Sequence, residues 1–206
     1  MAKGFPPSGG LWNSTRKNDV FLLVLLASSL SLNVYLGWSV KRLKSAPSAK
    51  PPDAVKLSPG TPVRPIETVS LSRERQETIS YSDYDKPTVF YVFSPTCVWC
   101  ERNTQNINAI ADLKGESFRF VGLSLAEEGL REYVESHRLN FPVYKNLTPE
   151  TVQALGLGST PQTIVVSPDG RIRQNWVGAY GAAIQPQVEG FFNVRLPGLA
   201  APMPRK

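Results

Sequence analysis

Two cysteines three residues apart, Cys97 and Cys100, constrain this chain more than any other feature, because they are its only cysteines. The apolar run before them, residues 88–93, has the composition of a buried strand. The segment 98–113 after them has apolar residues at helical spacing, and Gly115 follows as a stop signal. A strand that leads into a Cys-x-x-Cys at a helix start is typical of a reversible dithiol–disulfide pair.

The spacing also predicts the geometry of the pair. Residues i and i+3 in the first turn of a helix lie on one face, with Cα atoms about 5–6 Å apart, which a disulfide can bridge. Cys97 would sit where unpaired backbone N–H groups and the helix dipole stabilise a thiolate. We therefore expect its pKa to lie below the roughly 8.5 of a free cysteine. Cys100, one turn further on, is expected to be shielded and to react second.

Three other interpretations of the pair remain open. A purely structural disulfide is possible, but closing so short a loop stabilises by only about 2 kcal/mol, against about 4.7 for a hundred-residue loop. A closed zinc site needs four ligands, and the chain offers two Cys and the single His137, so no metal is predicted. Two inert buried thiols are the third alternative. The pattern favours redox chemistry.

Residues 20–40 contain no charged side chain and are long enough, as a helix, to span a hydrocarbon core of about 30 Å. Lys41, Arg42 and Lys44 follow directly, and much of the net charge of +6 lies in the first 60 residues. This pattern is typical of contact with anionic lipid headgroups and not with nucleic acid. We predict a single transmembrane helix over 20–40. A cleaved signal peptide and a buried core helix are the alternatives.

The rest of the chain divides by composition. We expect an N-terminal tail over 1–19, a proline-rich linker over 41–65, one folded domain over 66–196 and a frayed C-terminal tail over 197–206.

Strand and helix patterns alternate within the folded domain, which predicts an α/β fold with a mixed sheet. Beyond the elements around the cysteines, the expected strands are 66–71, 77–81, 118–125, 163–166 and 172–177, and the expected helices are 127–138, 149–155 and 181–194.

Together, the Cys-x-x-Cys after a strand, the segment 158–163 (GSTPQT) about sixty residues later and the Ser-Pro-Asp-Gly turn 167–170 resemble the thioredoxin superfamily. The extra hairpin before the Cys-x-x-Cys strand and the apolar segment are most similar to the TlpA/ResA-type membrane-anchored thiol–disulfide oxidoreductases. The resemblance covers about residues 64–194 and implies a thioredoxin-like fold with an extra N-terminal β-hairpin, preceded by a transmembrane helix.

The resemblance also implies site residues. It makes Cys97 and Cys100 the catalytic, redox-active disulfide and places a cis peptide bond at Thr160–Pro161 beside them. It implies that the backbone of Thr160 pairs with an extended substrate segment. Trp99, between the cysteines, would form an apolar rim for docking peptides or pack beside the disulfide.

Several residues depart from the superfamily pattern. Thr96 stands where many relatives have Trp, and Tyr91 stands where thioredoxins have a buried carboxylate. No evident acid or base therefore serves Cys100. We expect Glu101 to be a solvated acid in the first helical turn and His137 to be a surface or partly buried helix residue.

The main hypothesis is thiol–disulfide exchange with extracytoplasmic proteins, without a cofactor. We expect the domain on the outer, periplasmic side of a bacterial inner membrane, because an anchored dithiol carrier has most to do where disulfides form and persist. Taken literally, however, the positive-inside rule would put the carboxyl side in the cytoplasm. We expect a reductant in protein or cytochrome maturation, supplied by a membrane electron donor.

The alternative function is a binding module with an inert disulfide. A copper-chaperone-type carrier is less favoured because His137 lies in a helical pattern, away from any loop near the cysteines. A peroxiredoxin is also less favoured, because Phe90 and Ser94 do not recreate the Pro-x-x-x-Thr/Ser-x-x-Cys motif around Cys97.

Overall fold

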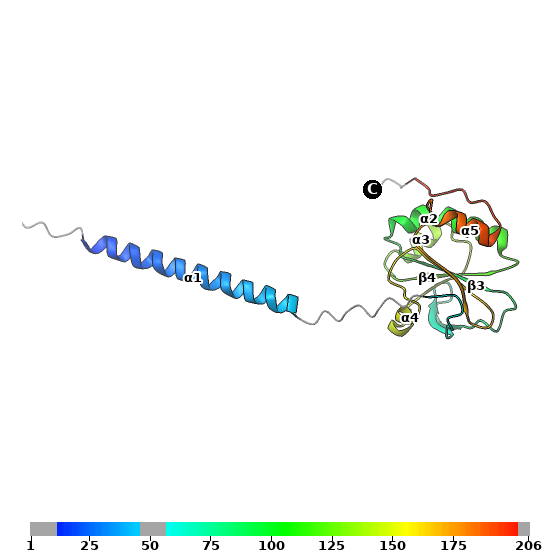
Figure 1. Ribbon diagram of the computed structural model, residues 1–206, viewed down its shortest axis with the longest axis horizontal. Helices are drawn as coiled ribbons and strands as arrows, with labels where there is room; N and C mark the ends of the chain where they lie inside the picture. Colours follow the sequence, from blue (N-terminus) through cyan, green and yellow to red (C-terminus); the bar gives the residue numbers. More distant parts are fainter. Residues whose placement is uncertain (1–11, 46–56, 202–206) are drawn as a thin grey trace, which may run out of the picture. The chain divides into compact units, whose positions relative to one another are not determined.

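The computed structural model describes residues 12–45 and 57–201, with side chains in the first range placed at 20–36 and 38 (Figure 1). The chain forms two compact units, Met1–Pro52 and Asp53–Lys206. Of the predicted segments, residues 1–11 of the tail, 46–56 of the linker and 202–206 of the C-terminal tail lie outside the described residues.

The described residues of the first unit form the helix α1 (Trp12–Ser45), which begins before and ends after the predicted span 20–40. Its large apolar side chains from Val20 to Trp38 are each at least half exposed. Within the described residues, no helix meets the length and hydropathy needed to cross a membrane. The predicted transmembrane helix is therefore not confirmed.

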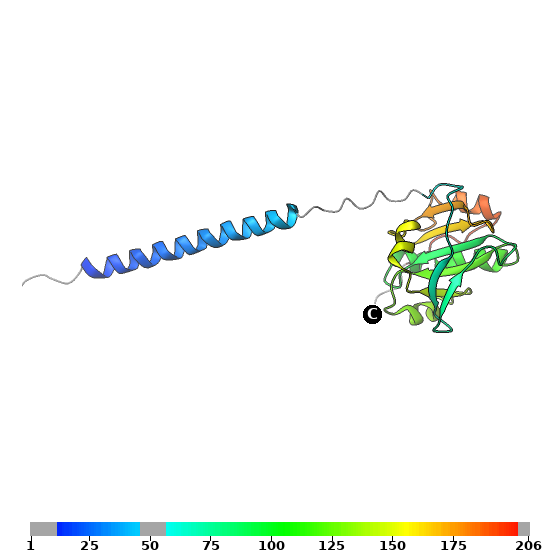
Figure 2. The ribbon, with the colours of Figure 1, turned by 90° about the horizontal axis from the view of Figure 1, so that it is seen from below.

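The second unit is built on one sheet. Within residues 57–201, seven strands form a mixed sheet in the order β2-β1-β5-β4-β3-β6-β7 (Figure 2). The strands are β1 (Ile66–Ser70), β2 (Gln76–Ile79), β3 (Thr88–Phe93), β4 (Arg119–Ser124), β5 (Val143–Lys145), β6 (Gln162–Val166) and β7 (Ile172–Val177). Every residue of β3 is buried, and this strand pairs in parallel with β4 and antiparallel with β6. The predicted central strand, the extra hairpin at one edge and the final hairpin at the other are confirmed.

Helices cover both faces of this sheet. Figure 1 shows α2, α3 and α5 on one side and α4 on the other. Their bounds are α2 (Val98–Lys114), α3 (Leu130–Ser136), α4 (Pro149–Ala154) and α5 (Gln185–Phe192). Each face has its own hydrophobic core, one rich in aromatic rings under α2 and α5 and one largely aliphatic. The predicted thioredoxin-like α/β fold is confirmed.

Local signals set the ends of the shorter helices. The Thr148 hydroxyl caps α4 by accepting the Thr151 N–H at 3.2 Å, and Pro149 opens the helix. The last helix is shorter than the predicted 181–194. Pro186 stands in its first turn, and Asn193, in the left-handed region at φ 49°, ends it.

Two predicted segments differ in their described parts. Leu57, expected in an extended linker, is buried, and Pro62 forms a β-bridge with Arg171. Residues 197–201, expected to be frayed, lie along α2, where the Gly198 N–H donates to Asn106 at 3.0 Å. Proline and small residues suggested a loose end because they favour no helix or strand, but a buried amide on α2 binds this segment.

Candidate active site

The cysteine pair lies where the sequence predicted it. The chain leaves the central strand β3 at Phe93 and turns through Ser94, and Cys97 becomes the N-cap of α2. Cys97 and Cys100 form a disulfide with Cα atoms 5.2 Å apart. The Cys97 sulfur accepts the Cys100 N–H at 3.1 Å, so the first-turn backbone donates to this sulfur.

The two sulfurs differ in access. Cys97 is partly exposed, whereas Cys100 is fully buried in the aromatic core beneath the helix. An incoming sulfur can approach only the first cysteine. This asymmetry is what an exchange reaction with one attacking and one resolving thiol requires.

The segment before β6 lies against this pair. The peptide bond Thr160–Pro161 is cis, as the resemblance implied. The Thr160 carbonyl oxygen lies 3.4 Å from the Cys97 sulfur, and Gly178 N–H donates to the Pro161 carbonyl at 2.8 Å. The fold thus brings together two motifs about sixty residues apart.

Trp99 faces outward from the first turn of α2. Its side chain is 53% exposed, and the Arg102 guanidinium lies 4.7 Å from the centroid of its ring. The ring is therefore exposed next to the accessible cysteine.

Tyr91 supplies a polar contact beneath the cysteines that sequence reasoning left without a role. Its hydroxyl donates to the Cys100 carbonyl at 3.2 Å from a fully buried side chain on β3. Burial raises the pKa of Tyr91 well above its ordinary value. The phenol therefore stays neutral and acts as a hydrogen-bond donor.

Sequence reasoning also missed a buried polar network beside Tyr91. The Asn103 side-chain oxygen accepts the Tyr180 N–H at 3.0 Å and the Asn106 amide at 3.1 Å. The Tyr180 and Thr163 hydroxyls are 2.7 Å apart. These bonds attach the loop after β7 and strand β6 to α2. The only sequence signal was a polar Asn103 on the buried face of a helix.

The Asn103 amide nitrogen faces Tyr91 without a hydrogen bond of ordinary geometry. It is close enough to lower the Tyr91 pKa slightly, against the larger effect of burial.

The two other titratable residues considered in the sequence, His137 and Glu101, lie at the C-terminal end of α3 and in α2, respectively. His137 ends α3, stacks on Tyr133 with ring centroids 4.2 Å apart, and places Nδ1 2.9 Å from the Tyr133 carbonyl. Glu101 is half-buried in the first turn of α2. Within the described residues, no three His, Cys, Asp or Glu side chains gather in a way that could hold a metal ion.

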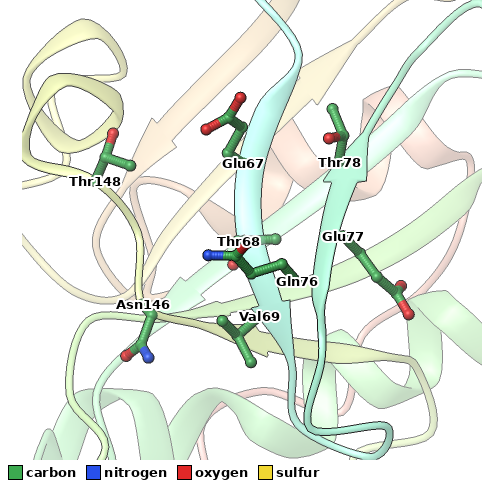
Figure 3. A pocket seen from close by; sticks show the side chains of 8 residues that line it. All are labelled: Glu67, Thr68, Val69, Gln76, Glu77, Thr78, Asn146 and Thr148. Carbon is green, nitrogen blue, oxygen red and sulfur yellow. The ribbon is translucent and has the colours of Figure 1, made fainter.

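A cavity of about 360 Å³ lies away from the cysteines, at the hairpin edge of the sheet. Figure 3 shows its lining side chains coming from β1, β2 and the segment after β5. Strands β5 and β4 separate this edge from β3. The cavity shares no lining residue with the cysteine site.

A family model described as the AhpC/TSA family matches residues 62–175. No curated protein matches the chain.

Three solved structures with similar folds are described as thiol–disulfide proteins. The thioredoxin domain of a thiol-disulfide oxidoreductase from Bacteroides vulgatus has 19% identity and a TM-score of 0.55, covering 67% of this chain and 100% of that one. A thiol:disulfide interchange protein of the thioredoxin family from Chlorobium tepidum has 20% identity and a TM-score of 0.53, covering 65% and 97%. A thiol:disulfide interchange protein from Bacteroides has 20% identity and a TM-score of 0.53, covering 66% and 91%. At these identities the likeness concerns the fold.

Proposed function

We propose that this chain, which belongs to the AhpC/TSA family and has the family and fold of a thiol–disulfide oxidoreductase, exchanges its Cys97–Cys100 disulfide with extracytoplasmic proteins. One observation carries the proposal. A partly exposed Cys97 and a buried Cys100 are bonded at the N-terminus of α2.

The reaction in the reducing direction has two exchange steps. The Cys97 thiolate attacks one sulfur of a substrate disulfide, and the other substrate sulfur leaves as a thiolate and takes up a proton. Cys100 then loses its proton, attacks Cys97 and releases the second substrate thiol. The substrate gains two electrons and two protons, and the Cys97–Cys100 pair loses them. The reverse sequence oxidises a dithiol.

Substrate approach is limited to the side of Cys97 that Thr160 and Trp99 border. The Thr160 carbonyl, 3.4 Å from the Cys97 sulfur, can accept a backbone N–H from an extended segment. The exposed Trp99 ring offers apolar area to the same segment. Tyr91 holds the first turn of α2 through its bond to the Cys100 carbonyl.

A membrane tether is the second part of the proposal. Apolar side chains of α1 between residues 20 and 36 are exposed, and Lys41 and Arg42 follow them in the sequence. Two serine hydroxyls and one asparagine amide on this helix donate to carbonyls of the same helix, which lowers the cost of placing them in lipid: Ser28, Ser31 and Asn33. We infer a single-pass anchor in a bacterial inner membrane, with the redox domain outside and a membrane dithiol donor restoring the reduced pair.

Mixed-disulfide trapping tests the exchange reaction. Full-length Cys100→Ser should accumulate a Cys97 adduct with its substrate proteins, because the second step cannot occur. The double variant with Cys97→Ser is the matched control and should trap nothing. Equal trapping by both would refute Cys97 as nucleophile. If a redox titration shows wild-type disulfide that stays oxidised throughout the glutathione range, the inert binding module is favoured.

Extraction and protease protection test the tether. Full-length protein should stay in the pellet after alkaline carbonate treatment of membranes, and its redox domain should be digested in intact spheroplasts. Leu26→Arg places a charge in the apolar run and should release the protein from the pellet. Recovery of wild type in the soluble fraction would contradict the anchor, and protection of the domain would reverse its orientation.

A further inference from the structure

The C-terminal segment after α5 makes an ordered attachment to the helix that carries the cysteines. We call residues 196–201 the C-terminal strap. Leu196 is buried, and its N–H donates to the Glu189 carboxylate at 2.9 Å. Further along, the Gly198 carbonyl accepts the Gln105 amide at 2.7 Å. The strap is therefore fixed at both α5 and α2.

Among the α2 residues that bind the strap, Arg102 is nearest to the cysteines along the helix. The Ala200 carbonyl accepts Arg102 Nε–H at 2.8 Å, and the Ala200 N–H donates to the Arg102 carbonyl at 2.9 Å. A free arginine side chain has many rotamers, and fixing one costs conformational entropy. Because Ala200 binds Nε, the guanidinium plane is held in one orientation.

That guanidinium in turn contacts Trp99, with its central carbon 4.7 Å from the ring centroid. A cation this close to an aromatic face is attracted to it. Trp99 stands between the two cysteines and is 53% exposed. A continuous series of contacts therefore runs from Ala200 through Arg102 to the ring beside the accessible Cys97.

We propose that the C-terminal strap is a positioning device which, through Arg102, holds the Trp99 ring in place to receive protein disulfides. This inference rests on the proposed exchange function. An aromatic contact residue fixed before binding loses less freedom when a partner docks. A polypeptide that extends beyond its disulfide can touch Trp99, whereas a small disulfide needs only the Cys97 sulfur. Arg102 and the strap are thus positioning elements that select for protein substrates.

Two variants test the device in the full-length protein. Truncation after Leu196 removes the contacts of Gly198 and Ala200, and truncation after Ala201 is its matched control because the strap remains. Arg102→Lys keeps the charge but lacks the planar Nε donor. Arg173→Lys is its control, since Arg173 also stacks on a ring, that of Phe191 at 5.8 Å.

The kinetic measurement compares insulin with a small aromatic disulfide. Truncation after Leu196 and Arg102→Lys should each raise KM for insulin about fivefold while leaving the rate with the small disulfide within about twofold of wild type. Both controls should match wild type with both substrates. Equal losses with both substrates would show a general structural defect and overturn the proposal, as would unchanged kinetics.

A second measurement does not depend on turnover. Fluorotryptophan-labelled protein contains four reporter sites, and Trp99→Phe assigns the Trp99 ¹⁹F resonance. That resonance should shift and sharpen in the Leu196 truncation and in Arg102→Lys, because the ring gains freedom. If wild type exchanges no disulfide, the proposed function fails and the selectivity claim fails with it, while a shifted resonance still establishes the contact series. A Trp99 resonance that is the same in both variants as in wild type would contradict the proposal that the strap positions the ring.

Discussion

The two hydrophobic cores on either side of the sheet differ in composition, although adjacent residues of the same strand, β3, contribute side chains to both. Tyr91 points to the α2 face and donates a hydrogen bond under the cysteines, whereas Phe90 points to the α4 face. The α2 face combines aromatic rings with buried amides and hydroxyls. The α4 face is mostly aliphatic. Both bury apolar area, but the hydroxyl of Tyr91 on the α2 face bonds to a backbone atom of the helix that carries the cysteines.

The aromatic packing reinforces this difference. Tyr91 stacks on Phe93 with centroids 5.8 Å apart, and Phe93 stacks on Tyr133 at 5.2 Å. Asn103 connects this layer to the loop after β7. Catalytic groups need to be held by neighbours that are themselves fixed. The residues that support the redox site therefore lie in the layer under α2, and the layer under α4 supplies stability.

The largest expected effect comes from removing the nucleophile on the α2 face. Cys97→Ser should lower insulin reduction by about a thousandfold or more, because a hydroxyl at neutral pH cannot replace a thiolate. Turnover measured beside wild type checks this. Activity of Cys97→Ser within tenfold of wild type would contradict the role of Cys97 as the nucleophile.

A large effect on stability alone is expected from the α4 face. Phe90→Ala removes a fully buried ring that packs edge-on against Tyr81, and should lower the free energy of unfolding by about 3–5 kcal/mol. Urea unfolding measures this. The exchange rate per folded molecule should stay within about twofold of wild type. A selective loss of exchange would mean that this face also orients the site.

A smaller effect, mainly on the exchange reaction and only slightly on stability, is expected from Tyr91→Phe. The change keeps the ring and removes only the hydroxyl bonded to the Cys100 carbonyl, at a cost of about 1 kcal/mol in stability. The resolving step should slow by roughly fivefold, since the first turn of α2 is less firmly held. Stopped-flow release of a mixed disulfide measures that step. Stability loss without slower release would make Tyr91 a packing residue only.

The smallest expected effect is that acid weakens the attachment of the C-terminal strap, through its hydrogen bond from the Leu196 N–H to the Glu189 carboxylate. Hydrogen bonds from the Gln185 amide and then the Leu196 N–H, with Arg195 nearby, hold the Glu189 pKa below its usual 4.5. A carboxylate with a depressed folded-state pKa stabilises above its unfolded pKa, and this contribution is lost as pH falls through the folded value. The Leu196 amide resonance should titrate below pH 4.5 and stay constant between about pH 5 and 8.

Glu189→Gln is the control for this titration and should show no such transition. A Leu196 resonance that titrates with the same midpoint in both proteins would place the acid-sensitive group elsewhere.

Much of the fold follows from short stretches of sequence. The run 88–93 was predicted as a central strand and is buried at every residue. A helix was predicted over 149–155, and Thr148 and Pro149 open it at that point. The placement of Cys97 at a helix start was also correct. In each case the deciding interactions join residues within one turn or one strand, so local pattern is sufficient.

The misses share a physical cause. Asn103 was one of several polar residues in α2, and its role depends on Tyr180, 77 residues away. The C-terminal strap was expected to fray, yet Ala200 binds Arg102 across 98 residues. Such pairs leave no periodic signal in the chain, because neither partner's local structure depends on the other.

By itself, the sequence determined the disulfide-forming pair, the strand and helix that hold it, and the α/β class, since these depend on spacing, propensity and caps among near neighbours. Tertiary structure alone decided which cysteine is exposed. It also decided that Tyr91 supports α2 and that Arg102 contacts the Trp99 ring. Those outcomes depend on burial and hydrogen bonding between distant segments, which exist only once the sheet has brought them together.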